Sequence, residues 1–392
     1  MKVRIAHNLF RGAPKFVLAL AFALAAHQGL AQGVTDDMLL NAHKESDNWR
    51  MVGRDYMSTR FSPLNQVSTK NVRRLVPKWT FSFGVLDAQN TTPLIHNGVM
   101  YVTASHGRTF AVNAKTGSMI WQYNHPLPED AGKNMCCDIG NRGAALYGDK
   151  VFVSTPDAHV VALDMNTGKP VWDVALGNYK NAYSMTVAPL IAKGKVIVGL
   201  SGAEYPTRLF IEALDANTGQ QAWRRYTIPA PGEPGAETWG SDADNLKFGG
   251  ASAWITGSYD PALNTVYWGT GNPNPDWDGV GRQGDNLYSN STLALDPDTG
   301  AIKFHFQYTP HDVWDFDGVN NAARDAQWSA MDCLVERAEF ELRCGLEAAV
   351  RLTAGRQRIA ARPLRGRFGG IADADTVVYI TRQVPACFHA PR

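Results

Sequence analysis

The sequence predicts an all-β fold, and three observations carry this prediction. A motif of the form A-x-D/N-x-x-T-G-x-x-x-W recurs along the middle of the chain. Its copies begin about fifty residues apart, a period typical of propellers and solenoids. Alternating β-branched and apolar residues precede each copy, as in antiparallel strands with turns between them. Each repeat therefore predicts one four-stranded antiparallel sheet, that is, one blade of a β-propeller.

Four copies of the motif define the predicted blades. They span Ala111–Trp121, Ala162–Trp172, Ala213–Trp223 and Ala294–Phe304, and the last has Phe in place of Trp. Their threonines, at 116, 167, 218 and 299, are separated by 51, 51 and 81 residues, so the last interval contains an insertion. In each turn the Asp or Asn side chain can close an Asx turn, and Gly can adopt positive φ. We expect each Trp to stack on the turn of the neighbouring blade, with four blades between about residues 75 and 320.

The N-terminal residues, 1–31, have the pattern of a cleavable export signal. Basic residues precede an apolar run over 16–26, and small residues follow it before position 32. The run is too short to span a bilayer, and no later stretch approaches membrane length. We therefore expect an exported, periplasmic protein without a membrane span, in a compartment that permits disulfides.

Charge separates the middle of the chain from its C-terminal part. Residues 32–321 hold 23 basic and 29 acidic side chains, a net −6 without a basic stripe, which makes nucleic acid an unexpected partner. Residues 322–392 hold 11 Arg, no Lys and 8 acidic side chains, and the motif does not recur there. We interpret 32–321 as a partial propeller domain and 322–392 as an unrelated, poorly packed tail. A shifted or fused reading frame explains such a tail, and a helical cap or linker is the alternative.

Polar residues follow equivalent strands in three of the repeats. Thr155, Glu204 and Asn272 each come soon after a buried strand, so they should occupy equivalent positions around one centre. A carboxylate and an amide oxygen suit a hard cation. Farther along, Asp315 and Asp317 are two apart, and on an extended backbone both would face that centre while Trp314 and Phe316 pack away from it. A solvated acidic loop is the alternative, but close carboxylates favour a bound cation.

A second acidic segment looks like a calcium loop but is interrupted. Asn274, Asp276 and Asp278 have the spacing of an EF-hand, with Asp285 in the twelfth place. Prolines at 273 and 275 break the pattern and no helical pattern flanks it, so we do not interpret it as a calcium site.

Two cysteines, Cys136 and Cys137, are adjacent in the sequence. Neighbouring Cα atoms lie about 3.8 Å apart, so a bridge between them requires a strained ring. In an exported protein the pair should be oxidised, and two buried free thiols are the alternative.

Taken together, these residues resemble a known family, the quinoprotein alcohol and methanol dehydrogenases that use pyrroloquinoline quinone (PQQ). The resemblance runs from about Asn48 to Asn320. The stretches that carry it are WRMVGRDYMSTRFSPLNQV, LPED with CCDIGNRGAALYGDKVF, RRYTIPAPGEP, WGTGNPNP with GDNLYSNSTLALDPDTG, and FHFQYTPHDVWDFDGVN. It implies an eight-bladed propeller, of which about four blades are present here. The second half of the family pattern finds no match after Asn321.

The resemblance also implies a role for individual residues. PQQ would lie between the Cys136–Cys137 ring and the Trp254 indole, and its polar groups would be held by Arg142, Thr155, Ser201, Gly202, Ala203 and Ser252. The metal ion would be bound by Glu204, Asn272, Asp315 and Asp317. Asp315 matches the catalytic base, and Asp317 matches the extra carboxylate of members that use a lanthanide(III) instead of Ca²⁺.

The function implied is oxidation of a small primary alcohol, with a cytochrome c as electron acceptor; a homodimer is left open. Two other hypotheses remain open: a non-catalytic exported propeller scaffold, and an inactive gene fragment. A scaffold requires neither the adjacent cysteines nor Trp254 nor the Asp315 and Asp317 pair. The missing family half leads us to expect little turnover from the chain as given.

Overall fold

The computed structural model describes residues 33–87, 89–135, 139–242 and 244–320. The predicted export signal, the Cys136–Cys137 pair and the tail 322–392 lie outside these residues. The described part of the chain contains no helix with the length and hydrophobicity of a transmembrane span.

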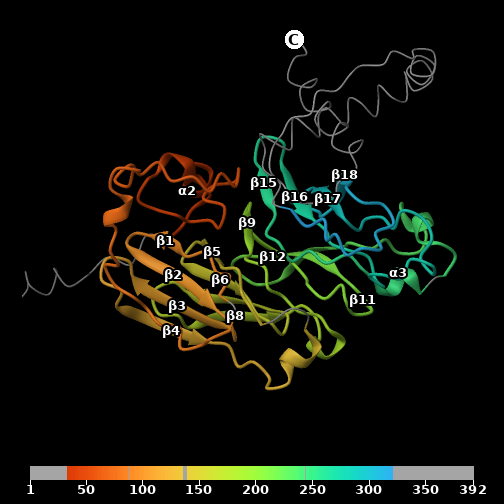
Figure 1. Cartoon of the computed structure of the whole chain (residues 1–392), viewed down its shortest axis with the longest axis horizontal. Coiled ribbons are helices and arrows are strands. Elements are labelled where there is room, and N and C mark those ends of the chain that lie inside the picture. The colour runs from red at the N-terminus through yellow and green to blue at the C-terminus, as the bar shows by residue number, and fades with distance from the viewer. Residues whose placement is uncertain (1–32, 88, 136–138, 243, 321–392) are drawn as a thin grey trace, which may run out of the picture.

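Four four-stranded antiparallel sheets form the body of the protein, one for each predicted blade (Figure 1). The first contains β1 (Leu94–His96), β2 (Val99–Ala104), β3 (Arg108–Asn113) and β4 (Met119–Asn124). The second contains β5 (Ala144–Tyr147), β6 (Lys150–Ser154), β7 (His159–Asp164) and β8 (Pro170–Ala175). The third contains β9 (Leu190–Ala192), β10 (Lys195–Gly199), β12 (Phe210–Asp215) and β13 (Gln221–Tyr226). The fourth contains β15 (Ser258–Asp260), β16 (Thr265–Gly269), β17 (Ser291–Leu295) and β18 (Ile302–Gln307).

The remaining elements are short. A two-stranded parallel pair joins β11 (Thr207–Arg208) to β14 (Gly249–Gly250). The helices are α2 (Asp36–Leu40) and α3 (Asn245–Phe248). The 3₁₀ turns are η1 (Ala42–Lys44), η2 (Val72–Arg74), η3 (Ala131–Asn134), η4 (Tyr179–Asn181) and η5 (Ala236–Trp239).

The turn of every repeat has the predicted chemistry. The side chains of Asn113, Asp164, Asp215 and Asp296 each accept hydrogen bonds from the backbone N–H groups two and three residues later. The glycine after each Thr has φ between +70° and +76°. Because this conformation disfavours a Cβ, the glycine is a structural requirement of the turn.

The motif tryptophans join each sheet to the next, as expected. The indole Nε1 atoms of Trp121, Trp172 and Trp223 donate to backbone carbonyls in the turn of the following sheet, at 2.9, 3.3 and 2.9 Å. Each ring also covers the turn glycine, Gly168, Gly219 or Gly300. Trp79, which the motif does not include, makes the same contact with the first sheet through Ala114 O and Gly117.

The sheets follow one another from one side of the molecule to the other (Figure 1). Contacts between them join neighbours, β2 with β5 and β5 with β9, and one apolar core runs through all four. The described residues do not close a ring of blades. Loops that follow strands of these sheets carry most of the predicted site residues.

Candidate active site

Polar loops follow the second strand of three successive sheets, as expected. Thr155 comes directly after β6, the segment 201–204 follows β10, and Asn272 follows β16. Backbone hydrogen bonds connect the loops at this end of the sheets, both between neighbouring sheets and within one sheet. Arg142 N donates to Thr186 O at 3.0 Å, and Ser201 N donates to Ser184 O at 2.9 Å. In the same way Ala253 N donates to Leu200 O and Gly271 N to Ser252 O, both at 2.7 Å.

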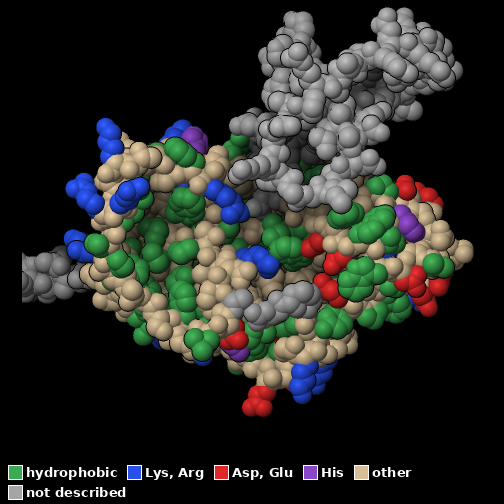
Figure 2. Space-filling view, viewed as in Figure 1, with side chains coloured by type: hydrophobic (Ala, Val, Ile, Leu, Met, Phe, Trp, Pro, Cys, Tyr) green, Lys and Arg blue, Asp and Glu red, His purple; other side chains and the backbone are tan. Residues whose placement is uncertain are grey.

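Three other segments bring Arg142, Trp254 and Asp317 together: Arg142 precedes β5, Trp254 precedes β15 and Asp317 follows β18. The Arg142 guanidinium lies over the Trp254 ring, 4.4 Å from its centroid, at a cation–π distance. Trp254 Nε1 donates to Asp317 Oδ2 at 2.7 Å. Burial lowers the pKa of Arg142, although the negative charge of Asp317 opposes this shift. The indole therefore connects a cation on its face to a carboxylate at its edge. On the face shown in Figure 2, acidic side chains gather beside a basic one near the middle of the molecule.

The second oxygen of Asp317 is buried and has no hydrogen-bond partner among the described residues. It lies so close to Gly271 that a Cβ at this position would collide with it, and the Cβ would also lie 2.6 Å from Ser252 Oγ. Glycine at 271 thus keeps open a small space lined by a carboxylate oxygen and a hydroxyl. A buried oxygen without a hydrogen-bond partner costs free energy, so this space suits a bound polar group or cation.

The acidic groups near this space repel one another. Burial, together with the charges of Asp315 and Glu204, raises the pKa of Asp317 to about 7, against the hydrogen bond from Trp254. Burial and then the same two charges raise the pKa of Asp276 to about 6. The pKa values of Glu204 and Asp315 are also raised, chiefly by burial. This pattern indicates a concentration of carboxylates that a cation would stabilise.

Several residues predicted to bind PQQ or the metal form hydrogen bonds with other parts of the protein. Thr155 is buried and its hydroxyl donates to Asp157 Oδ1 at 2.6 Å, so it belongs to a neighbouring histidine cluster. Asn272 is also buried, and its amide donates to Asp276 Oδ1 at 2.6 Å. Gly202 has φ of +118°, and a Cβ there would lie 2.5 Å from Ala182 O, which restricts this position to glycine. Ala203 is buried and its carbonyl accepts from Asn274 Nδ2 at 3.0 Å.

The carboxylates are not tightly gathered. In the part of the chain that the structure describes, the one acidic or imidazole triad with ligand atoms all within 4.8 Å is His125, Asp157 and His159. The charges of Glu204, Asp315 and Asp317 influence one another's pKa values. Their role as common ligands stays a prediction.

The extended backbone assumed for the acidic segment after β18 is wrong. Asp315 and Asp317 have φ of +59° and +45°, in the left-handed region that short polar side chains tolerate. Trp314 and Phe316 do not pack away into the protein; they are 63% and 64% exposed, with ring centroids 5.7 Å apart. The buried carboxylate of Asp312 accepts the backbone N–H groups of Trp314 and Phe316 and sets this turn.

Sequence reasoning missed two participants. The pattern around Asp276 indicates only an interrupted calcium loop, and its spacing of four from Asn272 is the signal that points to their contact. No sequence motif marks Thr186, whose hydroxyl accepts a hydrogen bond from Arg142 and lies 3.4 Å from Ser201 Oγ.

Comparisons with known proteins agree on one family. A family model described as the glucose/ethanol/alcohol dehydrogenase β-propeller domain, PQQ, matches residues 49–323. A quinoprotein alcohol dehydrogenase, PedH, of Pseudomonas putida is 42% identical over 327 residues, which are 78% of this chain and 54% of that protein. Methanol dehydrogenase [cytochrome c] subunit 1 of Methylorubrum extorquens is 38% identical over 330 residues. These are 78% of this chain and 52% of that protein.

Solved structures give the same result. A europium-containing methanol dehydrogenase superposes with a TM-score of 0.70 and 37% identity, covering 74% of this chain and 53% of that one. A quinohemoprotein alcohol dehydrogenase from Comamonas testosteroni superposes with a TM-score of 0.68 and 38% sequence identity. The match covers 75% of this chain and 46% of that one. The chain spans about half the length of the curated relatives it matches.

Proposed function

Because the chain belongs to the glucose/ethanol/alcohol dehydrogenase β-propeller family, we propose that it binds PQQ and one metal ion and oxidises primary alcohols. The observation that best supports this proposal is the group formed by Arg142, Trp254 and Asp317, with acidic side chains around it. An aromatic face, a guanidinium and a buried carboxylate suit a flat, anionic, conjugated ligand beside a cation.

The residues present fit a hard cation. Asp317 Oδ1 is buried beside Gly271 without a partner among the described residues, and burial and neighbouring charges raise the pKa of its carboxyl to about 7. Glu204, Asn272, Asp315 and Asp317 offer carboxylate and amide oxygens, the donor set that Ca²⁺ and lanthanide ions prefer. Three carboxylates carry a formal charge of about −3, which favours a trivalent ion by charge balance. The likeness to a europium-containing methanol dehydrogenase supports this choice.

The same residues fit PQQ. Trp254 would supply the stacking surface, and Arg142, Ser201 and Ser252 would supply donors for carboxylates and carbonyls. Thr155, Gly202 and Ala203 complete the proposed binding set, with Cys136 and Cys137 on the opposite face of the ring. When bound, PQQ supplies a carbon that accepts hydride, and the metal ion polarises its carbonyl.

In this proposal Asp315 accepts the proton of the substrate hydroxyl. Burial, and after it the charge of Asp312, raise the pKa of Asp315 and bring it closer to neutral pH, where a general base is most effective. The Trp254 indole orients Asp317 through its 2.7 Å hydrogen bond, which keeps one carboxylate oxygen directed at the space beside Gly271. The proposal also includes export to the periplasm and transfer of the electrons to a cytochrome c. The name of the Methylorubrum extorquens relative includes cytochrome c.

Metal binding tests the proposal without requiring turnover. The metal-free chain with PQQ is titrated with La³⁺ and with Ca²⁺ in a calorimeter. We expect one La³⁺ per chain, bound more tightly than Ca²⁺, and an affinity loss of about tenfold or more for Asp317→Ala, or ~1.4 kcal/mol. Asp278→Ala removes an exposed carboxylate outside the proposed ligand set and should bind as the wild type does.

Dye-linked oxidation of primary alcohols by the metal-loaded chain then tests the activity, and Asp315→Ala should abolish it. Equal La³⁺ affinity in Asp317→Ala and the wild type would refute the metal assignment. Since the chain spans about half the length of its relatives, turnover should be low. A chain that binds PQQ and La³⁺ without oxidising any alcohol would retain the sites and favour the inactive-fragment hypothesis over the activity.

A further inference from the structure

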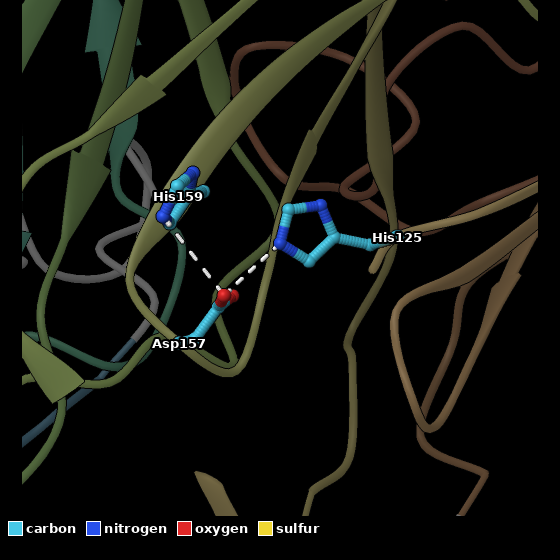
Figure 3. A group of neighbouring side chains, drawn as sticks. All are labelled: His125, Asp157 and His159. Carbon is cyan, nitrogen blue, oxygen red and sulfur yellow. Dashed lines mark hydrogen bonds and ion pairs between the residues drawn. The ribbon is translucent and has the colours of Figure 1, made fainter. Parts of the chain in front are cut away.

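A compact cluster of His125, Asp157 and His159 adjoins the site described above, and Thr155 contacts its carboxylate (Figure 3). His125 directly follows β4 of the first sheet, Asp157 lies in the turn between β6 and β7, and His159 begins β7 of the second sheet. One ligand atom from each residue lies within 4.8 Å of the other two. The cluster therefore joins two adjacent blades through three groups that can bind a metal.

Both imidazoles direct Nε2 at the same carboxylate oxygen. His125 Nε2 lies 3.1 Å and His159 Nε2 lies 3.9 Å from Asp157 Oδ2. Asp157 Oδ1 is held from the other side by the hydroxyl of Thr155, at 2.6 Å.

A second carboxylate supports the imidazoles from behind. Asp173, on β8, places Oδ1 2.7 Å from His159 Nδ1 and Oδ2 4.0 Å from His125 Nδ1. Tyr123 Oη lies 3.3 Å from His125 Nδ1. Metal-binding histidines commonly use their other ring nitrogen in this way, because the contact fixes the tautomer and the ring orientation.

We propose that His125, Asp157 and His159 form a second metal site, which binds a borderline divalent ion such as Zn²⁺. Two imidazole nitrogens and one carboxylate oxygen are a zinc ligand set with a fourth position open to water. The all-oxygen set around Asp317 suits a hard ion, so the two sites differ in chemical class. The side chains of His125 and Asp157 are buried at 2% and 5% exposure, whereas that of His159 is 30% exposed and gives an ion access from solvent.

The competing explanation is a hydrogen-bonded cluster that joins the sheets without a metal. Calorimetric titration of the untagged, chelator-treated full chain with Zn²⁺ distinguishes the two, together with metal analysis after gel filtration. We expect one retained Zn²⁺ per chain. His159→Gln and Asp157→Asn should each weaken binding by about 100-fold or more, and Asp173→Asn by about 10–100-fold.

Two controls make the result specific. His106→Gln removes a comparable but exposed pair, His106 Nε2 with Asp87 Oδ2 at 2.7 Å, and should retain wild-type Zn²⁺ affinity. Asp317→Ala should also retain it, because Asp317 belongs to the hard-ion site. Circular dichroism confirms that each variant is folded, and loss of the absorption bands of tetrahedral Co²⁺ in His159→Gln provides a second readout. Failure to retain Zn²⁺, or an equal affinity in wild type and His159→Gln, would overturn the proposal.

Discussion

Replacing Gly168 by Ala tests whether the contact between the motif Trp and the next turn holds adjacent blades together. Gly168 has φ of +70°, and a Cβ there would lie 2.5 Å from Cε3 of Trp121. Gly194 has nearly the same φ, +69°, but a Cβ there would first meet Tyr147 Oη at 3.6 Å, an ordinary contact. The two substitutions share the same backbone penalty, so the difference between them reports the collision with the indole.

The expected losses of unfolding free energy follow from the backbone penalty and the collision with the indole. Placing Ala in the left-handed region costs about 1–2 kcal/mol. Forcing an extra methyl group into a packed contact costs a further 1–3 kcal/mol, roughly. We therefore expect Gly194→Ala to lower the free energy of unfolding by about 1–2 kcal/mol and Gly168→Ala by about 2–5 kcal/mol.

Urea unfolding of the full chain, followed by far-UV circular dichroism, measures both values. Trp121→Ala alone should cost about 3–5 kcal/mol, since it removes a buried ring and its hydrogen bond to Met165 O. In that background the collision partner is gone, so Gly168→Ala should cost no more than Gly194→Ala. Equal losses for the two glycine variants in the wild-type background, or an unchanged cost in the Trp121→Ala background, would refute the reasoning.

Two further predictions concern polar contacts. Trp254→Phe keeps an aromatic face but removes the donor to Asp317, so La³⁺ affinity should fall about 10–100-fold in calorimetry, while exposed Trp277→Phe leaves it unchanged. Burial raises the pKa of Glu212 despite its pairing with Arg224, so the folded protein binds this proton more tightly than the unfolded chain. Stability from this group therefore falls as pH rises above about 4.5. The melting temperature of Glu212→Gln should improve relative to wild type between about pH 4 and pH 7; a constant gap would contradict this.

The repeat architecture was predictable because its determinants are local. Each T-G turn needs an Asx side chain and a glycine at positive φ within a few residues, and both have the predicted geometry. The Trp that follows is placed by strand geometry, so its contact with the next turn could be expected from spacing alone. The equivalent contact of Trp79 was not predicted, because this residue does not follow a copy of the motif.

The site was predicted only in part. Glu204 and Asn272 lie in loops that follow the second strand of their sheets, as the repeat predicts. Their role as metal ligands stays a prediction. The conformation after β18 was not predictable from periodicity, because Asp312 accepts local backbone hydrogen bonds and turns the chain into left-handed conformations at Asp315 and Asp317. Cys136 and Cys137 lie outside the described residues, and their bridge stays a prediction.

The sequence by itself determined the number of sheets in the middle of the chain, their turns and the family, since these depend on short-range patterns repeated along it. Only the tertiary structure decided which polar groups meet. His125 and Asp157 are 32 residues apart in the sequence, and Trp254 and Asp317 are 63 apart. In each pair the two residues come from different segments of the chain that only the packing of the sheets brings into contact. No local spacing encodes such pairs; their distance and burial, and therefore their pKa values and metal-binding capacity, follow from how successive blades pack.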